Sequence, residues 1–441
     1  MKVLYFLQGV FLPCFVIITA CQPSPSIQSS VDLFYMPAEY EAHEAVWLGW
    51  FEFGPYYQPF LDVAKALHGH VPLKMIARSE TELQHLKDSL MSQALDTAAI
   101  DFFVMEDNRL WMRDHGATYV VNQLGQKKVI DFGWTLYGHK EVLMGRYGGD
   151  MDSVQHYYDL RLGRTGLIDS LMGSSEGWSS IKTDVNMEGG SIEVNGKGSL
   201  ILCETVTMQR NPDLSKSYIE EEFRRVLGVS NIIWMKEGLA DDPFKLSKIY
   251  DDYYGMGTFG HTDEFVRFAN DSTILLAWVS EEEKDLNPLN QMNYSRMSRN
   301  LQILEHSTDQ DGHPWKIVKV PLPELISERV AIKEDMDHDW DNSLLLRWLG
   351  HPDPNLQAGD SVYRVPASSY LNYLVTNEVL LLPTYLAEGT SKEKEQEVIE
   401  IFQRYFPNRE LALIEPMNLN YFGGGIHCIT QQEPKVSSEK E

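Results

Sequence analysis

The chain has 441 residues, of which 43% are hydrophobic and 11% aromatic, and it carries a formal net charge of −26. This length and apolar content suffice for one large domain or two ordinary ones with a buried core. An acidic field of this size disfavours nucleic acid and anionic lipid as partners, and it is compatible with a cationic substrate.

The N-terminal residues 1–20 are predicted to be a signal peptide for export. Lys2 begins an apolar stretch that Pro13 interrupts, so the stretch is too short for a transmembrane helix. The small residues before Cys21 resemble the cleavage site of a bacterial lipoprotein, which predicts lipidation of Cys21 and attachment to a bacterial membrane. An ordinary secretory signal, giving a periplasmic or secreted protein, is the alternative. Residues 21–35 are predicted to form a flexible tether.

Five copies of one unit, a β-hairpin followed by a helix and a further strand, are predicted along the chain. The clearest copy runs from 191 to 235. It has two strands joined by the turn Asn195-Gly196, a helix from Ser215 to Gly228, and a final strand. Two further copies are predicted at 265–320 and 370–414, and a hairpin at 117–132 opens a fourth. A fifth is assembled from the N-terminal part, where a strand, a helix and a strand alternate over 71–105.

Units of this kind cannot bury their apolar faces alone, so they pack side by side or around an axis. The predicted fold class is α/β. The units can be arranged in a ring around an axis, and an ordinary α/β sheet with hairpins is the alternative. Loops that combine glycines with chemically reactive residues precede the first strand of successive units. This placement favours a ring, because equivalent loops then meet at its centre. The loops are 111–116, 187–190 and 260–263, and the Gly-rich segment 423–428 follows the last unit.

Cys203 and Cys428 are the cysteines that remain when Cys14 and Cys21 of the N-terminal segment are set aside. Cys203 ends an apolar run and is predicted to be a buried strand residue, with a Cys203–Cys428 disulfide as the alternative. The sequence has no Cys-x-x-Cys motif, so neither a zinc site nor a redox pair is predicted. We expect the protein to use no metal and no cofactor.

The loops together supply carboxylates at Asp114, Glu188 and Asp263, an imidazole at His261 and a thiol at Cys428. A guanidinium group suits this set, because it is planar, permanently charged and offers five N–H donors that two carboxylates can bind. Its central carbon is a poor electrophile, so a thiolate is a better nucleophile than a hydroxyl. We expect Cys428 to attack this carbon and ammonia to leave with a proton from His261. Water then hydrolyses the covalent thiouronium intermediate to a ureido product.

Two other classes of function fit part of this pattern. A metallohydrolase would use His261, Asp263 and Glu188 as ligands, but no further histidine lies at a ligand-like spacing and Cys428 would have no part. A non-catalytic, lipid-anchored protein that binds guanidinium compounds would use Asp114 and Asp263, and its cysteine would be incidental.

Five motifs resemble those of the agmatine deiminase family, which is grouped with the bacterial, Porphyromonas-type peptidylarginine deiminases. They occur in the family's order at 36–43, 111–116, 188–192, 260–263 and 423–432. The resemblance implies a five-bladed pseudosymmetric α/β propeller in a single deiminase catalytic domain at 36–434. A polar tail at 435–441 follows this domain.

The same resemblance implies a role for each reactive residue. Cys428 is the nucleophile, His261 and Glu188 have acid–base and positioning roles, and Asp114 and Asp263 clamp the guanidinium. Trp111 and Gly424, which belong to the same motifs, are also predicted to contact the substrate.

The sequence is compatible with two classes of substrate. The motifs favour agmatine, which yields N-carbamoylputrescine and ammonia. However, Arg109 stands where the agmatine enzymes have Asp, and Glu264 stands where they commonly have Asn. These departures and the export signal favour peptidylarginine or free arginine, which yield citrulline. The segments 139–184 and 236–259 are longer than in cytosolic agmatine enzymes, and 236–259 is predicted to be a lid before His261 or an ordinary surface insertion.

Overall fold

The computed structural model describes residues 33–106, 109–138, 140, 149–334, 344–345 and 356–436. The predicted signal peptide, Cys21, almost all of the predicted tether and most of the polar tail lie outside the described residues. Among the helices that the structure describes, none has both the length and the hydropathy that are needed to cross a bilayer.

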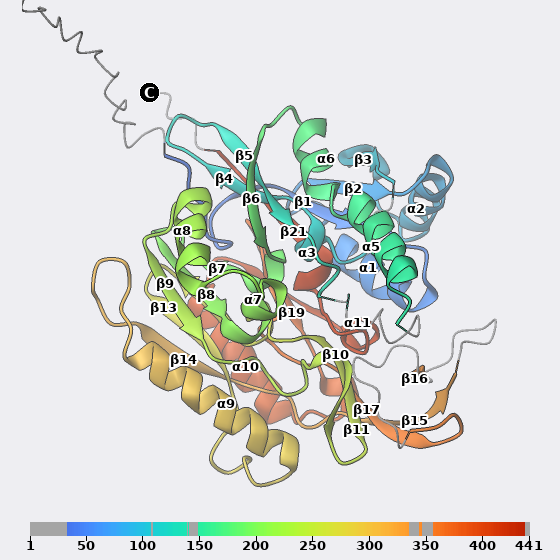
Figure 1. Cartoon of the computed structure of the whole chain (residues 1–441), viewed down its shortest axis with the longest axis vertical. Helices are drawn as coiled ribbons and strands as arrows, with labels where there is room; N and C mark the ends of the chain where they lie inside the picture. Colours follow the sequence, from blue (N-terminus) through green and yellow to red (C-terminus); the bar gives the residue numbers. More distant parts are fainter. Residues whose placement is uncertain are drawn as a thin grey trace, which may run out of the picture.

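Four three-stranded sheets share one pattern, in which the first two strands are antiparallel and the third is parallel to the second (Figure 1). Each antiparallel pair is a hairpin, and a helix lies between its second strand and the third. The strands are β4 (Thr118–Val121), β5 (Lys127–Gly133) and β6 (Ser180–Asn186); β7 (Glu193–Val194), β8 (Ser199–Cys203) and β9 (Asn231–Met235); β12 (Val266–Asn270), β13 (Thr273–Trp278) and β14 (Lys316–Pro321); β18 (Leu374–Val375), β19 (Val379–Pro383) and β20 (Glu410–Ile414).

A fifth sheet repeats this pattern with a strand taken from the other end of the chain. Its order is β21-β1-β2-β3, with β21 antiparallel to β1 and the other neighbours parallel. The residues near the two ends of the described chain therefore share one sheet. The strands are β1 (His43–Gly49), β2 (Leu73–Ala77), β3 (Ile100–Val104) and β21 (Thr430–Pro434).

A sixth sheet lies outside the repeated pattern and has the order β10-β11-β17-β15-β16. The segment 236–259 contributes its first two strands, so most of this segment is a β-hairpin rather than an irregular loop. The strands are β10 (Phe244–Tyr250), β11 (Tyr253–Thr258), β15 (Glu328–Lys333), β16 (Leu344–Leu345) and β17 (Ser361–Val365). None of the sheets in the described part of the chain is closed, and the prediction of an α/β fold is confirmed.

The helices connect and cover these sheets (Figure 1). The segment 139–184 contains α5, α6 and the strand β6. The α-helices are α1 (Gly54–Leu67), α2 (Glu80–Ser92), α3 (Met112–His115), α5 (Met151–Thr165), α6 (Ile168–Ser175), α7 (Glu204–Arg210), α8 (Lys216–Leu227), α9 (Pro288–Glu305), α10 (Lys392–Tyr405) and α11 (Met417–Asn420). Short 3₁₀ turns are η2 (Thr97–Ala99), η3 (Gly189–Ser191), η4 (Thr262–Glu264), η6 (Leu386–Glu388) and η7 (His427–Ile429).

Helix α8 forms where the sequence predicts it. Ser215 caps its N-terminus by accepting a hydrogen bond from the amide of Tyr218, and Gly228 ends it in the left-handed conformation with φ 66°. Phe223 and Val226 lie on its buried face. Tyr218 is partly exposed, and its hydroxyl donates a hydrogen bond to Asp184.

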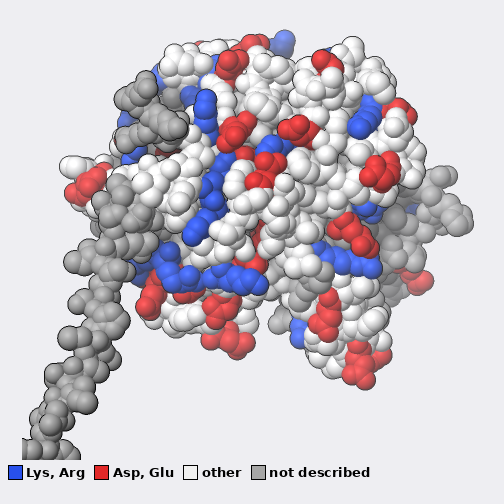
Figure 2. Space-filling model, turned by 90° about the horizontal axis from the view of Figure 1, so that it is seen from above, with Lys and Arg blue, Asp and Glu red and all other residues white. Residues whose placement is uncertain are grey.

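Acidic and basic side chains are both visible over one face of the molecule, where a band of Lys and Arg crosses between scattered Asp and Glu (Figure 2). The net charge of −26 is therefore not collected into one acidic patch on this face. The acidic groups that matter for chemistry lie inside the molecule instead.

Candidate active site

The five predicted reactive side chains come from four short turns that lie beside the repeated sheets. Asp114 is on α3, before β4, and Glu188 directly precedes η3, before β7. His261 and Asp263 flank the start of η4, before β12, and Cys428 is on η7, before β21. All five are buried, and the contacts below join them into one cluster.

The His261 ring lies between two carboxylates. Its Nε2 is 3.4 Å from an oxygen of Glu188, and its Nδ1 is 3.5 Å from Oδ1 of Asp114. Burial acts to lower the pKa of His261, but Asp114, Glu188 and Asp263 outweigh it and raise the pKa to about 9. The ring is therefore an imidazolium at neutral pH, and it is a proton donor to a nitrogen leaving group.

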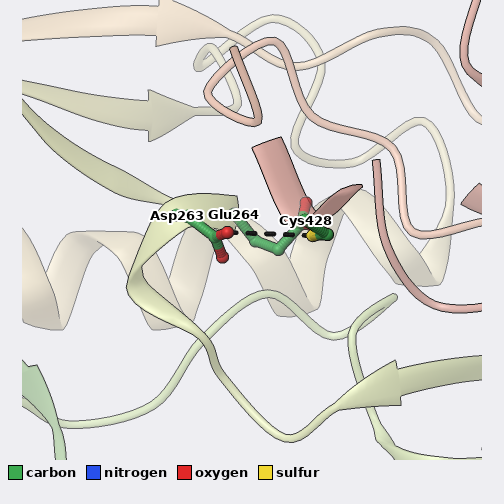
Figure 3. A group of neighbouring side chains, drawn as sticks. All are labelled: Asp263, Glu264 and Cys428. Atoms are coloured by element: carbon green, nitrogen blue, oxygen red, sulfur yellow. Dashed lines mark hydrogen bonds between the residues drawn. The ribbon is translucent and has the colours of Figure 1, made fainter. Parts of the chain in front are cut away.

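The Cys428 thiol lies against two further carboxyl groups (Figure 3). Its Sγ is 3.7 Å from Oδ2 of Asp263 and 3.9 Å from Oε1 of Glu264, and it accepts a hydrogen bond of 3.2 Å from Nδ2 of Asn372. Burial and the neighbouring Asp263, Glu264 and Asp114 raise its pKa well above 9. Cys428 is therefore a neutral thiol until a cation enters the cluster.

The two carboxylates predicted as a clamp have different partners. Asp263 accepts a hydrogen bond of 2.7 Å from Nδ1 of His427, while its other oxygen has no hydrogen-bond partner among the described residues. Asp114 accepts from the hydroxyl of Tyr137 at 2.9 Å. Burial raises the pKa of Asp114 to about 6, although His261 opposes this. Both groups have capacity to accept N–H donors from a guanidinium.

Glu188 is held in place by an arginine that the sequence analysis did not single out. Nε of Arg210, on α7, lies 2.9 Å from Oε1 of Glu188, and both side chains are almost completely buried. Burial acts to raise the pKa of Glu188, but Arg210 and His261 outweigh it, so the pKa is lowered. Glu188 is therefore a carboxylate with a fixed orientation toward His261.

Glycines allow these loops to approach one another closely. A Cβ on Gly190 would lie 2.6 Å from Nδ1 of His261 and 3.0 Å from oxygens of Asp114 and Asp263. A Cβ on Gly424 would lie 2.6 Å from the ring of Trp111 and 3.2 Å from Cβ of Cys428. Both positions require a residue without a side chain. Trp111, predicted to contact the substrate, is therefore packed against the loop that carries the thiol.

Three further groups join the cluster without having been predicted. Asn372 bonds to the thiol and also donates to Glu264 at 2.8 Å, and its Oδ1 accepts from the amide of His427 at 2.9 Å. Glu264 was noted only as a departure from the agmatine enzymes. Glu39 lies 2.5 Å from Nε2 of His427, so the imidazole bridges Glu39 and Asp263. Asn372 lies just before β18, the position equivalent to the other reactive loops, and this repeat position could have identified it.

Cys203 lies in β8, is buried, and forms no disulfide with Cys428. The prediction of a buried strand cysteine is thus confirmed. Cys428 remains available as a thiol.

The family model described as Porphyromonas-type peptidyl-arginine deiminase matches residues 35–434 of the chain. The chain belongs to this family. It is therefore a deiminase, a hydrolase that acts on C–N bonds, and the match spans all five repeated sheets. The predicted family membership is confirmed.

Proteins named as agmatine deiminases are similar to nearly the whole chain. An agmatine deiminase of Pseudomonas aeruginosa is 29% identical over 93% of this chain and 98% of its own. An agmatine deiminase of Pseudomonas fluorescens is 28% identical over 91% of this chain and 96% of its own. The solved structure of Enterococcus faecalis agmatine deiminase is 26% identical, covers 92% of this chain and 96% of its own, and has a TM-score of 0.68.

Proposed function

We propose that this deiminase hydrolyses agmatine to N-carbamoylputrescine and ammonia, with Cys428 as the nucleophile. The observation that carries the proposal is a buried thiol placed against Asp263 and Glu264, beside an imidazolium held by Glu188 and Asp114. Agmatine is the first candidate because the curated relatives described above are agmatine deiminases.

Binding of the guanidinium activates the thiol. Asp114 and Asp263 accept its N–H donors, and its positive charge offsets the carboxylates that hold Cys428 in the neutral form. The thiol then releases its proton to water, and the sulfur attacks the central carbon, forming a tetrahedral adduct. Gly424 lies between the Trp111 ring and Cys428, so we expect Trp111 and Gly424 to contact the substrate near the sulfur.

His261 gives its proton to one nitrogen of the adduct as the C–N bond breaks. Ammonia leaves, and the carbon remains bound to sulfur as a thiouronium. The neutral His261 then takes a proton from a water molecule that attacks this carbon. The C–S bond breaks, the departing sulfur takes the remaining hydroxyl proton to become a thiol again, and the ureido product is released. Glu188, fixed by Arg210, keeps the imidazole in position throughout.

Peptidylarginine or free arginine is the second candidate substrate. The family's own description names peptidylarginine, and Arg109 and Glu264 are the two departures from the agmatine enzymes. Arg109 stacks on Phe51 with its guanidinium 5.7 Å from the ring centre.

An ammonia assay with agmatine, free arginine and a blocked peptidylarginine tests both candidates. We expect release from agmatine, and Cys428→Ala should abolish it while the control Cys203→Ala, at the other buried cysteine, retains it. Release from peptidylarginine or arginine alone would replace agmatine as the substrate, and release from none of the three would reject the catalytic proposal. Activity lost on chelation but retained in Cys428→Ala would instead support the metallohydrolase.

The repeated sheets and the N-terminus lead to two related proposals. We propose that the five sheets of similar topology surround the reactive cluster as a five-bladed propeller, which an experimental structure can test. We also propose that the protein is exported and anchored through a lipid on Cys21. Incorporation of labelled palmitate that is lost in Cys21→Ala would support the anchor, and equal labelling of both proteins would reject it.

A further inference from the structure

A small pocket lies beside Asp114, and Cys428 does not line it. Its lining includes Asp114, His115 and Trp134, together with Asp169 on α6. Helix α6 packs on β5 at this place (Figure 1). Gly189, directly after Glu188, completes the boundary with the catalytic cluster. Because Asp114 also contacts His261, the pocket begins one side chain away from the group that protonates the leaving nitrogen.

Buried polar groups around this pocket have fewer partners than they can bind. His115 is only 5% exposed, and apart from the backbone of Trp111 its ring has no hydrogen-bond partner among the described residues. Nε1 of Trp134 also has none there. Unpartnered buried polar groups are costly, so their presence around one pocket indicates that the pocket holds a polar molecule.

The pocket favours a small molecule that can become a cation. It has room for a molecule about the size of water, which excludes the carbon chain of a guanidinium substrate. Asp169 is 7% exposed and has no basic partner among the described side chains. Burial raises the pKa of Asp169 to about 8, and burial lowers that of His115 to about 3. At neutral pH the pocket therefore offers a carboxyl proton, a neutral imidazole acceptor and the aromatic face of Trp134.

We propose that this pocket receives the released ammonia and holds it as ammonium against Asp169 before it leaves the protein. The proposal rests on the deiminase reaction, because that reaction supplies the ammonia. Ammonia carries the lone pair left by the broken C–N bond, and in the pocket that lone pair takes the carboxyl proton of Asp169. The products are ammonium and a carboxylate, and no further reactant is needed. When ammonium departs, Asp169 regains its proton from water.

Product inhibition tests this site in the full-length protein. We expect added ammonium chloride to inhibit turnover more strongly than sodium chloride or tetramethylammonium chloride, which is too large for the pocket. Asp169→Asn should raise the inhibition constant for ammonium at least tenfold, while the single-turnover rate changes less than twofold. Asp131→Asn is the matched control, because it removes a nearby negative charge that does not line the pocket, and it should leave the inhibition constant unchanged. Equal inhibition constants in the wild type and Asp169→Asn would overturn the proposal.

A second measurement does not depend on turnover or on a variant. Rubidium ions resemble ammonium in size, and their anomalous scattering locates them in crystals. We expect a rubidium ion within coordination distance of Asp169 in soaked wild-type crystals above the pKa of that carboxyl. A pocket that holds only water under these conditions would reject the ammonium site, even if the enzyme releases ammonia. Conversely, if none of the three substrates releases ammonia, the deimination reaction is rejected, whether or not a rubidium ion binds near Asp169.

Discussion

The protonation states of His261 and Cys428 predict a specific pH dependence. Burial opposes the charge on His261, but three carboxylates raise its pKa to about 9, so it is a proton donor below this pH and loses that role above it. We therefore expect kcat/KM for agmatine to fall as the pH rises through about 9. A pH profile of initial rates measures this, and a fall centred near the ordinary histidine pKa of about 6.5 would contradict it.

The free protein should also react slowly with alkylating agents. Burial and three neighbouring acids raise the pKa of Cys428 well above 9, so little thiolate exists at neutral pH without a bound cation. We expect the rate of carboxamidomethylation at Cys428, followed by mass spectrometry, to stay low at pH 7 and 8 and to rise above pH 9. N-acetylcysteine serves as the unperturbed reference thiol. Alkylation of Cys428 as fast as this reference at pH 8 would reject a neutral resting thiol.

The sequence was more informative about which residues react than about which residues hold them. Cys428 and His261 could be selected because their chemistry is uncommon and they stand beside glycines in equivalent loops. Asn372 and Glu39 could not be selected in this way, because an amide or a carboxylate is unremarkable until its partners are known. Their partners, Cys428 and His427, lie 56 and 388 positions away along the chain.

The reactive loops depend on glycine as much as on charged residues. A Cβ at Gly190 would lie 2.6 Å from Nδ1 of His261, and the backbone there does not have a positive φ, so the obstacle is steric crowding alone. We expect Gly190→Ala to lower kcat by roughly 100-fold, because small displacements of catalytic groups are that costly. The far-UV circular dichroism should be unchanged.

Gly54→Ala is the control for this variant. Nothing lies within 4 Å of a Cβ at Gly54, and its backbone also lacks a positive φ. Its kcat should therefore equal that of the wild type. If Gly190→Ala retained full activity, the close approach of η3 to His261 would have no catalytic importance.

The elements were predictable where the signal is local. The turn Asn195-Gly196 and the cap at Ser215 act within a few residues, so the unit containing β7, β8, α8 and β9 could be placed from sequence. The hairpin of β10 and β11 was not recognised. Its acids and glycines resemble a loop, and its strand pairing with β17 joins residues about 110 positions apart. Pairing at that distance leaves no local pattern.

At the scale of the whole molecule, one buried ion cluster joins distant parts of the chain. Glu39 lies 2.9 Å from Nη2 of Arg267 and 3.6 Å from Nη2 of Arg113, besides its contact with His427. It also accepts a hydrogen bond from the amide of Val375. These partners belong to four separate segments, so Glu39 links the start of the domain to the loops of the reactive cluster.

Replacing Glu39 should therefore destabilise the whole fold. Glu39→Gln removes one buried counter-charge from the guanidinium groups of Arg113 and Arg267, of which Arg267 keeps Glu193, and we expect the free energy of unfolding to fall by about 3–5 kcal/mol. Denaturant unfolding followed by circular dichroism measures the loss. Glu44→Gln is the control, because the Glu44 side chain is exposed and its buried partner Lys127 keeps a second carboxylate, Glu433, so removing this pair should cost about 1 kcal/mol or less. Equal losses in the two variants would show that the buried cluster adds no stability.

The same cluster predicts how stability changes with acid. Burial acts to raise the pKa of Glu39, but Arg267, His427 and Arg113 outweigh it, so the folded-state pKa lies well below the ordinary value of 4.5. When folding lowers the pKa of a carboxyl group, that group stabilises the protein fully at any pH above its pKa in the unfolded chain. This stabilisation is lost as the pH falls from the unfolded-state pKa through the folded-state pKa. We expect the unfolding free energy of the wild type to decline below about pH 4.5, and Glu39→Gln to lose part of that decline. An unchanged acid dependence in the variant would assign the loss of stability to other carboxyl groups.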